Sequence, residues 1–335
     1  MKAVIPAAGQ GTRLYPQTHT KPKAMVRLAG RPILGHILSS LAETPIEEVV
    51  VVVGGPMQAQ ITDYATEQFG DRFDFAFPEQ ESTEGLGHSI YQAREAVGDD
   101  SMLIALGDML FESGYGSFLA AHHENGDTDG SIGLKPVEHP QHYGVAEVED
   151  GAITRLVEKP EDPASNLAVS GIYIVEATGA LFDAVEHLVE NDIRGAGEEY
   201  QLTDALQRMV DAGHRLGTFE VQDWYDCGRP ETLLEANRIL LASSETGTGD
   251  ALDNSVVIPP VDAGDDVTVS ESVVGPNVSI DDGTTIENSI VRDSIVGRRA
   301  SLEGVNLAGS LVGDNATVEG DPTRLNLGDN SSIEL

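Results

Sequence analysis

The sequence of 335 residues has one cysteine, few basic residues and no long hydrophobic run. Its single thiol, Cys227, excludes an internal disulfide framework. Asp and Glu number 56 against 20 Lys and Arg, so the formal net charge is −36. A charge of this sign repels nucleic acid phosphates and anionic membrane surfaces, so neither is expected as a partner. No signal peptide and no membrane-spanning run is seen, and a cytoplasmic protein is therefore expected.

Lysine is scarce even among the basic residues, since five of the 20 are lysines. A surface this acidic and this poor in lysine is typical of proteins from salt-loving organisms, where dense salt screens the self-repulsion of the charges. We therefore expect a protein from a halophilic archaeon. The alternative is an ordinary acidic cytosolic protein, which would keep its activity and compactness in low salt.

The first half of the chain alternates short apolar runs with helical patterns, and its length favours two domains. The runs at 2–7, 47–55 and 101–110 are rich in aliphatic residues and end on or contain glycine or proline, which favours buried parallel strands. Helical patterns occupy 32–43 and 87–97. This alternation predicts an α/β doubly wound domain, whose ligands should bind at the carboxyl ends of the strands.

From about residue 131 the pattern turns to strands joined by turns, and helical signals then return. Strands are expected within 129–137, 143–160 and 166–175, and helices within 179–190, 200–213 and 229–243. The stretch SETGTGD at 244–250 is rich in turn and small polar residues, which indicates a linker. We therefore predict a catalytic domain at 1–243, a linker at 244–250 and a second domain at 251–335.

The last segment, 251–335, contains no aromatic residue, no lysine and no histidine. Aliphatic residues recur there every six positions within the groups Val261 and Val267; Val274, Ile280 and Ile286; Val296 and Leu302; and Val312 and Val318. This hexapeptide spacing predicts a parallel β-helix, in which each coil stacks its aliphatic side chains on the coil before it. The alternative is a loose acidic tail, although such tails do not keep an aliphatic register.

The opening segment, IPAAGQGTRLYPQTHTKPKAM at residues 5–25, concentrates glycines and cations in an otherwise acidic chain. Gly9 and Gly11 would let backbone N–H groups converge on an anion after the first strand. A third glycine and a Gly-Lys-Ser/Thr sequence are both missing, which excludes the dinucleotide fingerprint and the P-loop. Arg13 offers a planar fork for phosphate oxygens and Lys23 a mobile charge, so the loop predicts a triphosphate site.

These residues, with several later segments, resemble the sugar-1-phosphate nucleotidylyltransferases, whose opening motif is G-x-G-T-R-L-x-P-x-T followed by P-K. The motif here is GQGTRLYPQTHTKPKAM, and the later matches in the family's order are LGDML, YGV, VEKP, NLAVSGIYIV, GEEYQLTDAL and WYDCGRPETLLEAN. The resemblance covers residues 1 to about 240. It is greatest to the glucose-1-phosphate thymidylyl- and uridylyltransferases.

The resemblance implies a Rossmann-like nucleotidyltransferase domain followed by a left-handed parallel β-helix. It also implies a Mg²⁺-dependent enzyme that transfers a nucleoside monophosphate from dTTP or UTP to glucose 1-phosphate and releases pyrophosphate. The implied partners are these small substrates, and a homo-oligomer is expected, because an open β-helix end exposes strand edges that another subunit can cover.

The residue roles implied by the resemblance fall into three groups. Implied catalytic residues are Arg13, Lys23, Asp108 and Asp226, of which the two aspartates are also the implied Mg²⁺ ligands. Implied nucleotide-binding residues are Ala8, Gly9, Gly11, Thr12, Gln80 and Gly85, the Gln80 amide offering both a donor and an acceptor to a base. Implied sugar-phosphate residues are Gly144, Glu158, Lys159, Val169, Tyr173 and Arg194. Surface charge pairs, turn or capping roles and plain loops are the alternatives for these positions.

The sequence departs from the family pattern at two places. Met109 stands where an asparagine commonly follows the metal-binding aspartate, and the base-site segment is QESTEGLGHSI, which leaves the choice of base open. His88, His139 and His142 lack the spacing of metal ligands and are not assigned a role. Two other classes stay open, a bifunctional enzyme that also transfers acetyl groups to make UDP-N-acetylglucosamine and a non-catalytic regulatory subunit. The lack of histidine and lysine in 251–335 argues against the first, and the retained aspartates argue against the second.

Overall fold

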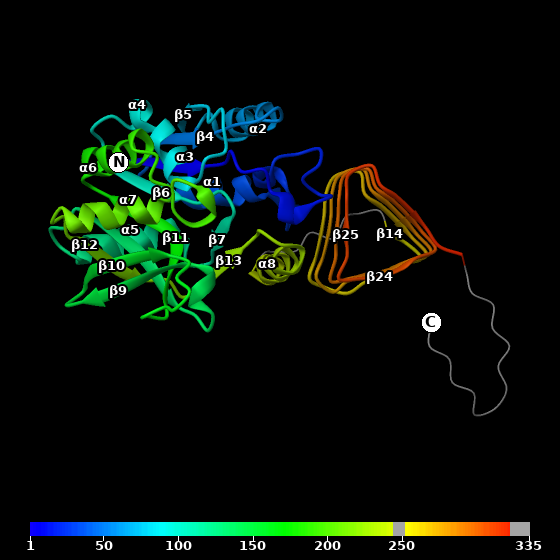
Figure 1. Cartoon of the computed structure of the whole chain (residues 1–335). Coiled ribbons are helices and arrows are strands. Elements are labelled where there is room, and N and C mark those ends of the chain that lie inside the picture. The colour runs from blue at the N-terminus through cyan, green and yellow to red at the C-terminus, as the bar shows by residue number, and fades with distance from the viewer. Residues whose placement is uncertain (244–251, 322–335) are drawn as a thin grey trace. The chain divides into compact units, whose positions relative to one another are not determined.

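The computed structural model describes residues 1–243 and 252–321. They fall into two compact units, one formed by Met1–Arg27 with Arg31–Ala236, and the other by Leu28–Gly30 with the chain from Asn237 onward. The first unit is an α/β domain and the second contains a parallel β-helix (Figure 1). The segment 244–250, predicted to be a linker, lies outside the described residues.

A nine-stranded mixed sheet forms the centre of the α/β unit. Its strands, in spatial order, are β5 (Asp74–Ala76), β4 (Glu48–Val52), β1 (Lys2–Pro6), β6 (Met102–Ala105), β11 (Leu167–Val175), β8 (Gly130–Pro136), β12 (Leu216–Glu220), β10 (Ala152–Glu158) and β9 (Gly144–Glu149). The first four are parallel, whereas β11 runs antiparallel to β6 and β8. The predicted doubly wound α/β architecture is confirmed, and β5 and β12 are strands of this sheet that the sequence analysis did not identify.

Both faces of the parallel strands are buried. Val4, Val50 and Ile104 pack into one hydrophobic cluster with residues of α3 (Leu86–Gln92), α6 (Thr178–Glu190) and α7 (Leu202–Asp211). The alternate residues Ala3 and Val49 point to the other face and are equally buried. Elsewhere in the unit, α1 (Ile33–Ala42) contacts α2 (Ala59–Phe69) and α5 (Gly114–Glu124). This two-sided burial explains why the strands read as unbroken aliphatic runs.

The remaining elements of the described chain are short, apart from one helix. They are η1 (Thr12–Leu14), η2 (Lys23–Met25), η3 (Pro140–His142), η4 (Ala196–Glu198), the paired β2 (Arg27–Leu28) and β3 (Arg31–Pro32), the paired β7 (Met109–Phe111) and β13 (Trp224–Asp226), α4 (Arg94–Val97) and α8 (Pro230–Ser243). The helical pattern at 87–97 is divided at Ala93 between α3 and α4. Within the described residues, no helix is long and apolar enough to span a membrane.

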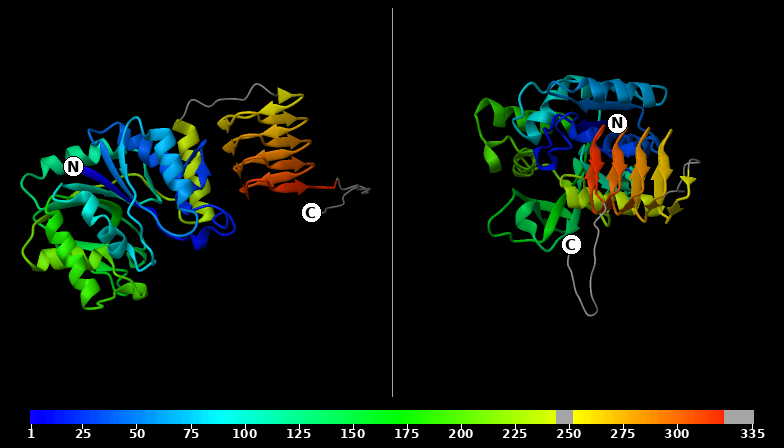
Figure 2. Two further views of the ribbon diagram at one scale, coloured as in Figure 1. Left: turned by 90° about the horizontal axis from the view of Figure 1, so that it is seen from above. Right: turned by 90° about the vertical axis from the view of Figure 1, so that its right-hand side faces the viewer.

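The β-helix is built from three parallel sheets whose strands stack coil on coil (Figure 2). The sheets are β14 (Leu252–Asp253), β17 (Thr268–Ser270), β20 (Thr285–Glu287), β23 (Ser301–Glu303) and β26 (Thr317–Glu319); β15 (Val256–Val257), β18 (Val273–Val274), β21 (Ile290–Arg292) and β24 (Asn306–Ala308); and β16 (Val261–Ala263), β19 (Val278–Ile280), β22 (Ile295–Val296) and β25 (Leu311–Val312). Ile286 pairs with Leu302 and Leu302 with Val318, and Ile286 and Leu302 are fully buried. The predicted β-helix with a stacked aliphatic core is confirmed.

One corner of the β-helix repeats a left-handed backbone conformation in successive coils. Asn254, Glu271, Asn288 and Gly304 all have positive φ and follow strands that pair in register. Glycine and asparagine adopt left-handed φ at lower energy than glutamate does. Glu271, with φ of 49°, is therefore the strained member of the corner.

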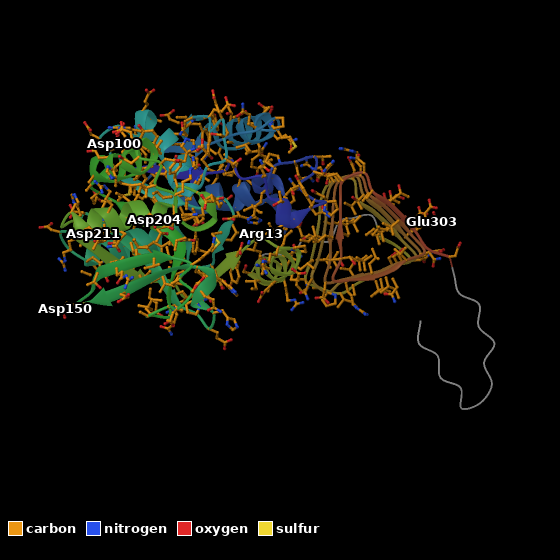
Figure 3. The ribbon with its side chains drawn as sticks, viewed as in Figure 1. Arg13, Asp100, Asp150, Asp204, Asp211 and Glu303 are labelled. Carbon is orange, nitrogen blue, oxygen red and sulfur yellow. The ribbon has the colours of Figure 1, made fainter. Side chains whose placement is uncertain are left out.

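Replacing Glu271 by asparagine is expected to stabilise the β-helix by about 0.5–1 kcal/mol, because Asn adopts left-handed φ at lower cost. Thermal unfolding of the full-length protein measures the change. The control is Glu303→Asn, at a residue labelled in Figure 3. It removes the same charge from β23, where φ is not positive. An equal rise in melting temperature for both variants would attribute the gain to charge and contradict the strain argument.

Candidate active site

The glycine loop after β1 folds back onto the segment that carries Lys23. Gly11 has φ of 62°, and a Cβ at this position would lie 2.9 Å from Lys23 Cβ and 3.0 Å from Thr18 Cγ2. The Thr18 hydroxyl donates to the Gly11 carbonyl at 2.8 Å, which closes the loop. Glycine is therefore required at position 11 by its backbone angle and by close packing. The result is that Arg13 on η1 and Lys23 on η2 come from one compact turn.

A cavity of about 380 Å³ opens where β1 and β6 end. It is lined by Pro6, Ala7, Ala8, Gly9, Arg13, Lys23, Ala24, Gln80, Thr83, Gly85, Leu86, Ser89, Leu106, Gly107, Asp108 and Glu199. A Cβ on Gly107 would lie 2.7 Å from the Pro6 carbonyl, so the loops after the two strands are in direct contact. The position agrees with the rule that ligands bind at the carboxyl ends of parallel strands.

Only some of the predicted nucleotide-binding residues line this cavity. Ala8, Gly9, Gln80 and Gly85 line it with Arg13, Lys23 and Asp108, whereas Gly11 and Thr12 are not among the lining residues. Thr83, Ser89 and Glu199 also line it and were not predicted. Glu199 arrives from the segment before α7, whose residue Tyr200 donates its backbone N–H to the Glu84 carbonyl at 2.8 Å. No local pattern in the sequence indicates that long-range contact.

The two predicted metal aspartates are neighbours although they are far apart in sequence. Asp226 ends β13 and pairs with Met109 of β7, directly after Asp108. The Cys227 backbone N–H donates to the Asp108 carbonyl at 2.9 Å, which extends the same antiparallel pairing. Both carboxylates are therefore placed by the short antiparallel sheet of β7 and β13, which the sequence analysis identified only as two separate motifs.

The cations of the opening loop lie against these carboxylates. Lys23 Nζ makes an ion pair and hydrogen bond with Asp108 Oδ2. A Cβ on Gly228 would lie 2.5 Å from Asp226 Oδ1, 3.1 Å from Lys23 Nζ and 3.3 Å from Arg13 Nη2. These three side chains therefore converge around the bare Cα of Gly228. All four predicted catalytic residues, Arg13, Lys23, Asp108 and Asp226, are thus brought together.

Cys227 lies beside this cluster as a buried thiol. Its side chain is fully buried, and this burial raises the pKa of the thiol, with the neighbouring Asp108 carboxylate raising it further. A raised pKa keeps the sulfur protonated at neutral pH, and the protonated thiol is a poor nucleophile and metal ligand. The residue therefore packs the site as a protonated thiol.

The aspartate pair fits a magnesium ion. One oxygen of each carboxylate is engaged, Asp108 Oδ2 by Lys23 and Asp226 Oδ1 by the Gly228 N–H at 2.8 Å, which leaves the second oxygen of each for a ligand. Among the described residues, no group of three or more His, Cys, Asp or Glu side chains is placed to hold a metal. Mg²⁺ commonly uses one or two carboxylates and takes its other ligands from phosphates and water. The donor set therefore suits a metal that takes its other ligands from phosphate oxygens and water.

The predicted sugar-phosphate residues gather at a second place in the α/β unit. A Cβ on Gly144 would lie 2.9 Å from Glu158 Oε2 and 3.5 Å from Val169 Cγ2. Glu158 Oε2 accepts a hydrogen bond from the Thr203 hydroxyl at 2.8 Å, and its Oε1 lies 3.5 Å from Lys159 Nζ. These residues do not line the 380 Å³ cavity. Thr203, which was not predicted, orients the carboxylate.

Two further members of this predicted group have different surroundings. Tyr173 is 4% exposed in the hydrophobic core, and burial, followed by the charge of Glu158, raises its pKa. Arg194 pairs with Asp192 at 2.7 Å and with Glu84 at 2.9 Å. Its guanidinium also lies 4.2 Å from the centre of the Tyr200 ring. Arg194 therefore ties two loops together, and a phosphate would have to compete with two carboxylates for it.

Asp204 is a carboxylate near this group that the sequence analysis missed. It is half-buried, and desolvation, with the charge of Glu158 as the second cause, raises its pKa. A Cβ on Gly195 would lie 2.2 Å from Asp204 Oδ2, so the loop before α7 approaches this carboxylate closely. The carboxylates of Glu158 and Asp204 provide hydrogen-bond acceptors at this second group of residues.

The comparison with known proteins decides the family. The profile of the family described as nucleotidyl transferase matches residues 2–243. The chain belongs to this family. The low-salt glycan biosynthesis nucleotidyltransferase Agl11 of Haloferax volcanii is 37% identical over 243 residues, covering 72% of this chain and 66% of the relative. The chain thus spans just under two thirds of the length of that relative.

Other nucleotidyl transferases match over their full length. The UTP–glucose-1-phosphate uridylyltransferase AglF of Haloferax volcanii is 35% identical, covering 74% of this chain and 100% of the relative. A glucose-1-phosphate thymidylyltransferase of Streptomyces antibioticus is 32% identical, covering 100% and 99%. A solved UDP-glucose pyrophosphorylase complexed with UDP-glucose aligns with a TM-score of 0.62 and 26% identity, covering 72% and 99%. The Haloferax relatives support the halophilic character inferred from the composition.

Proposed function

We propose that this nucleotidyl transferase moves a nucleoside monophosphate from dTTP or UTP to glucose 1-phosphate, giving a nucleotide sugar and pyrophosphate. The observation that carries the proposal is the convergence of Arg13, Lys23, Asp108 and Asp226 beside a cavity at the carboxyl ends of β1 and β6. The relatives named for glucose-1-phosphate transfer support the choice of acceptor, and they include both a thymidylyl- and a uridylyltransferase.

The reaction needs positioning and charge more than proton transfer. A phosphate oxygen of glucose 1-phosphate attacks the α-phosphorus, and the bond to pyrophosphate breaks as the new P–O bond forms. No general base is required, because the attacking phosphate is already ionised at neutral pH. Arg13 steadies the leaving pyrophosphate, and Lys23 turns from Asp108 toward the reacting phosphates. When held by Asp108 and Asp226, Mg²⁺ supplies charge that neutralises phosphate oxygens.

The sugar phosphate is assigned to the second group of residues. Glu158, oriented by Thr203, accepts hydrogen bonds from sugar hydroxyls. Lys159 has a side chain that is 54% exposed, so its ammonium group can leave Glu158 and pair with the phosphate. Gly144 leaves room for this carboxylate, because a Cβ at this position would lie 2.9 Å from Glu158 Oε2.

The deciding experiment is a substrate matrix in high salt. Pyrophosphate release is measured for dTTP, UTP, CTP, ATP and GTP against glucose-, galactose- and N-acetylglucosamine-1-phosphate, with and without added Mg²⁺. The proposal expects Mg²⁺-dependent release with a pyrimidine triphosphate and glucose 1-phosphate as the preferred pair. Release that prefers another sugar would correct the acceptor, and no release with any pair would favour the regulatory subunit.

A bifunctional enzyme remains the second candidate. Relatives of that kind, named bifunctional protein GlmU, are 35% identical over 265 residues in Methanococcus vannielii. Residues 251–335 contain no histidine or lysine, so this segment has neither a histidine base nor lysines for the phosphates of coenzyme A. Acetyl transfer from acetyl-coenzyme A to glucosamine 1-phosphate by the full-length chain would reverse this preference.

We further propose that the β-helix is an assembly and stability element. Its coils end in strand edges, and a second subunit can cover such edges. Val256 and Ile290, which pair through Val273 on one outer sheet, are 56% and 42% exposed, so the outer surface also offers apolar contact area.

Truncation after Ser243, the last residue of α8, is expected to lower the oligomeric state in high salt, because the covering surface is removed. Light scattering measures the mass and calorimetry the melting temperature, which should also fall. Nucleotidyl transfer should remain measurable, since the cavity residues all precede the cut. A truncated protein with unchanged subunit number and melting would contradict the assembly role.

A further inference from the structure

Gln80 lines the cavity, and hydrogen bonding fixes its backbone there. Its N–H donates to the Val53 carbonyl at 2.8 Å, in a bridge that continues the parallel pairing beyond β4. A Cβ on Gly54 would lie 2.6 Å from the Gln80 carbonyl, so glycine permits this close approach. The residue is 5% exposed and lines the cavity. The position of its backbone is therefore fixed, and the orientation of its side-chain amide depends on the groups that the amide contacts.

The amide nitrogen of Gln80 faces two acceptors of the protein. It lies 3.4 Å from the Gly85 carbonyl and 3.0 Å from His88 Nδ1. A backbone carbonyl can only accept, so the group that faces it must be the NH₂ end of the amide. With both N–H bonds directed to protein groups, the amide oxygen is the atom left to contact a ligand. No hydrogen bond to that oxygen is formed by the residues that the structure describes.

The arrangement requires a neutral His88 that carries its proton on Nε2. Nδ1 must accept from Gln80, and a neutral imidazole has one accepting and one donating nitrogen. The Gln92 amide nitrogen lies 3.1 Å from Nε2 and donates to the His88 backbone carbonyl at 3.2 Å, so the Gln92 amide must turn its oxygen to Nε2 to receive that proton. His88 stands on α3, which begins directly after Gly85, and its ring centre lies 6.2 Å from that of Tyr200. The imidazole is therefore held on two sides.

We propose that His88 is a positioning residue that fixes the Gln80 amide with its oxygen toward the nucleobase. An oxygen acceptor suits a base with a ring N–H, such as N3–H of uracil or thymine. Cytosine has an unprotonated acceptor at N3, so the two lone pairs would face each other. The fixed amide therefore selects uracil and thymine against cytosine. This inference rests on the proposed function, because it takes the 380 Å³ cavity to be the nucleotide site.

Without His88 the selection weakens, because only the longer 3.4 Å contact to the Gly85 carbonyl then holds the Gln80 amide, which can rotate and offer its nitrogen to cytosine. The test compares the dissociation constants of UTP and CTP by calorimetry on the full-length protein, without sugar phosphate, so that it does not depend on turnover. In His88→Leu the CTP to UTP ratio should fall about tenfold, the scale of one hydrogen bond. His88→Asn, whose side-chain oxygen can replace Nδ1, should restore the ratio.

Two controls separate positioning from general damage. His139→Leu changes an exposed histidine that makes no contact with Gln80 and should leave the ratio unchanged. The melting temperature of His88→Leu should stay near that of the unmodified protein, since the side chain is half-buried. An unchanged ratio in His88→Leu, or failure of His88→Asn to restore it, would overturn the role of His88.

The same titrations keep this inference distinct from the proposed function. If the protein binds UTP but releases no pyrophosphate with any sugar phosphate, the proposed function fails and the His88 comparison still decides the inference. If the protein transfers nucleotides but His88→Leu keeps full discrimination, the inference alone fails. If UTP and CTP bind equally to the unmodified protein, or neither binds, the fixed amide selects nothing and the inference is wrong.

Discussion

Replacing Asp108 by asparagine is expected to lower the rate of nucleotidyl transfer by about 10²-fold or more, with the fold retained. A neutral amide is a weak ligand for Mg²⁺ and also leaves Lys23 without its ion-pair partner. The exposed fraction of the Asp108 side chain is 31%, so the substitution creates no cavity. The expected loss is therefore in turnover and not in stability, and the pyrophosphate release assay measures it.

The matched control is Asp100→Asn. Asp100 pairs with Lys2 at 3.3 Å in the same unit and lies well away from Arg13 (Figure 3). Its loss removes the same charge from the same chain, yet we expect turnover to stay within about twofold, as for most exposed ion pairs. Near-normal pyrophosphate release by Asp108→Asn, or an equal loss in both variants, would remove Asp108 from the mechanism.

Most of the fold could be predicted from the sequence because burial leaves a direct record in residue order. The parallel strands are buried on both faces and read as unbroken aliphatic runs, as at Val49–Val52 of β4. Within one coil of the β-helix, the buried residues Val274, Ile280 and Ile286 recur every six positions, so the aliphatic register is visible in the sequence. The strand β5 was missed because its three residues, one of them exposed, are too short to show a pattern.

The candidate site was predictable where one segment carries the whole motif and less so where segments meet. Arg13 and Lys23 belong to one loop, and the composition of that loop already indicates an anion site. The position of Glu199 beside the cavity depends on how distant segments pack. The hydrogen bond between His88 and Gln80 depends on how the loop before α3 folds. His88 was left without a role because its spacing was tested only against metal ligation, and hydrogen bonds to an amide have no sequence spacing of their own.

Arg194 is the opposite case, because a residue that the resemblance assigns to the sugar phosphate makes its contacts within the protein. Its guanidinium is engaged by Asp192, Glu84 and the Tyr200 ring. The hydrogen bonds to Asp192 and then Glu84 raise its pKa, so its charge is permanent. The phosphate role that the resemblance implies stays a prediction, since the three contacts would have to be exchanged for a ligand.

Replacing Gly228 by alanine is expected to lower turnover by about 10²-fold, because a displacement near 1 Å in a reacting site has an effect of this size. The added Cβ would lie 2.5 Å from Asp226 Oδ1, which is closer than non-bonded atoms approach. The next atoms it meets are Lys23 Nζ and Arg13 Nη2, all ends of side chains. These ends can move without unfolding the chain, so the methyl group displaces three proposed catalytic side chains at once.

The measurement therefore separates geometry from stability. Single-turnover transfer should slow in Gly228→Ala while the melting temperature changes little, since the backbone at Gly228 is not in the left-handed region. Gly116→Ala is the matched control, because a Cβ at that position in α5 has no atom within 4 Å. If Gly228→Ala unfolded the protein, the contact would be structural. If it kept full turnover, the convergence of Arg13, Lys23 and Asp226 around this glycine would not be the reacting centre, since the one atom that crowds all three would have been tolerated.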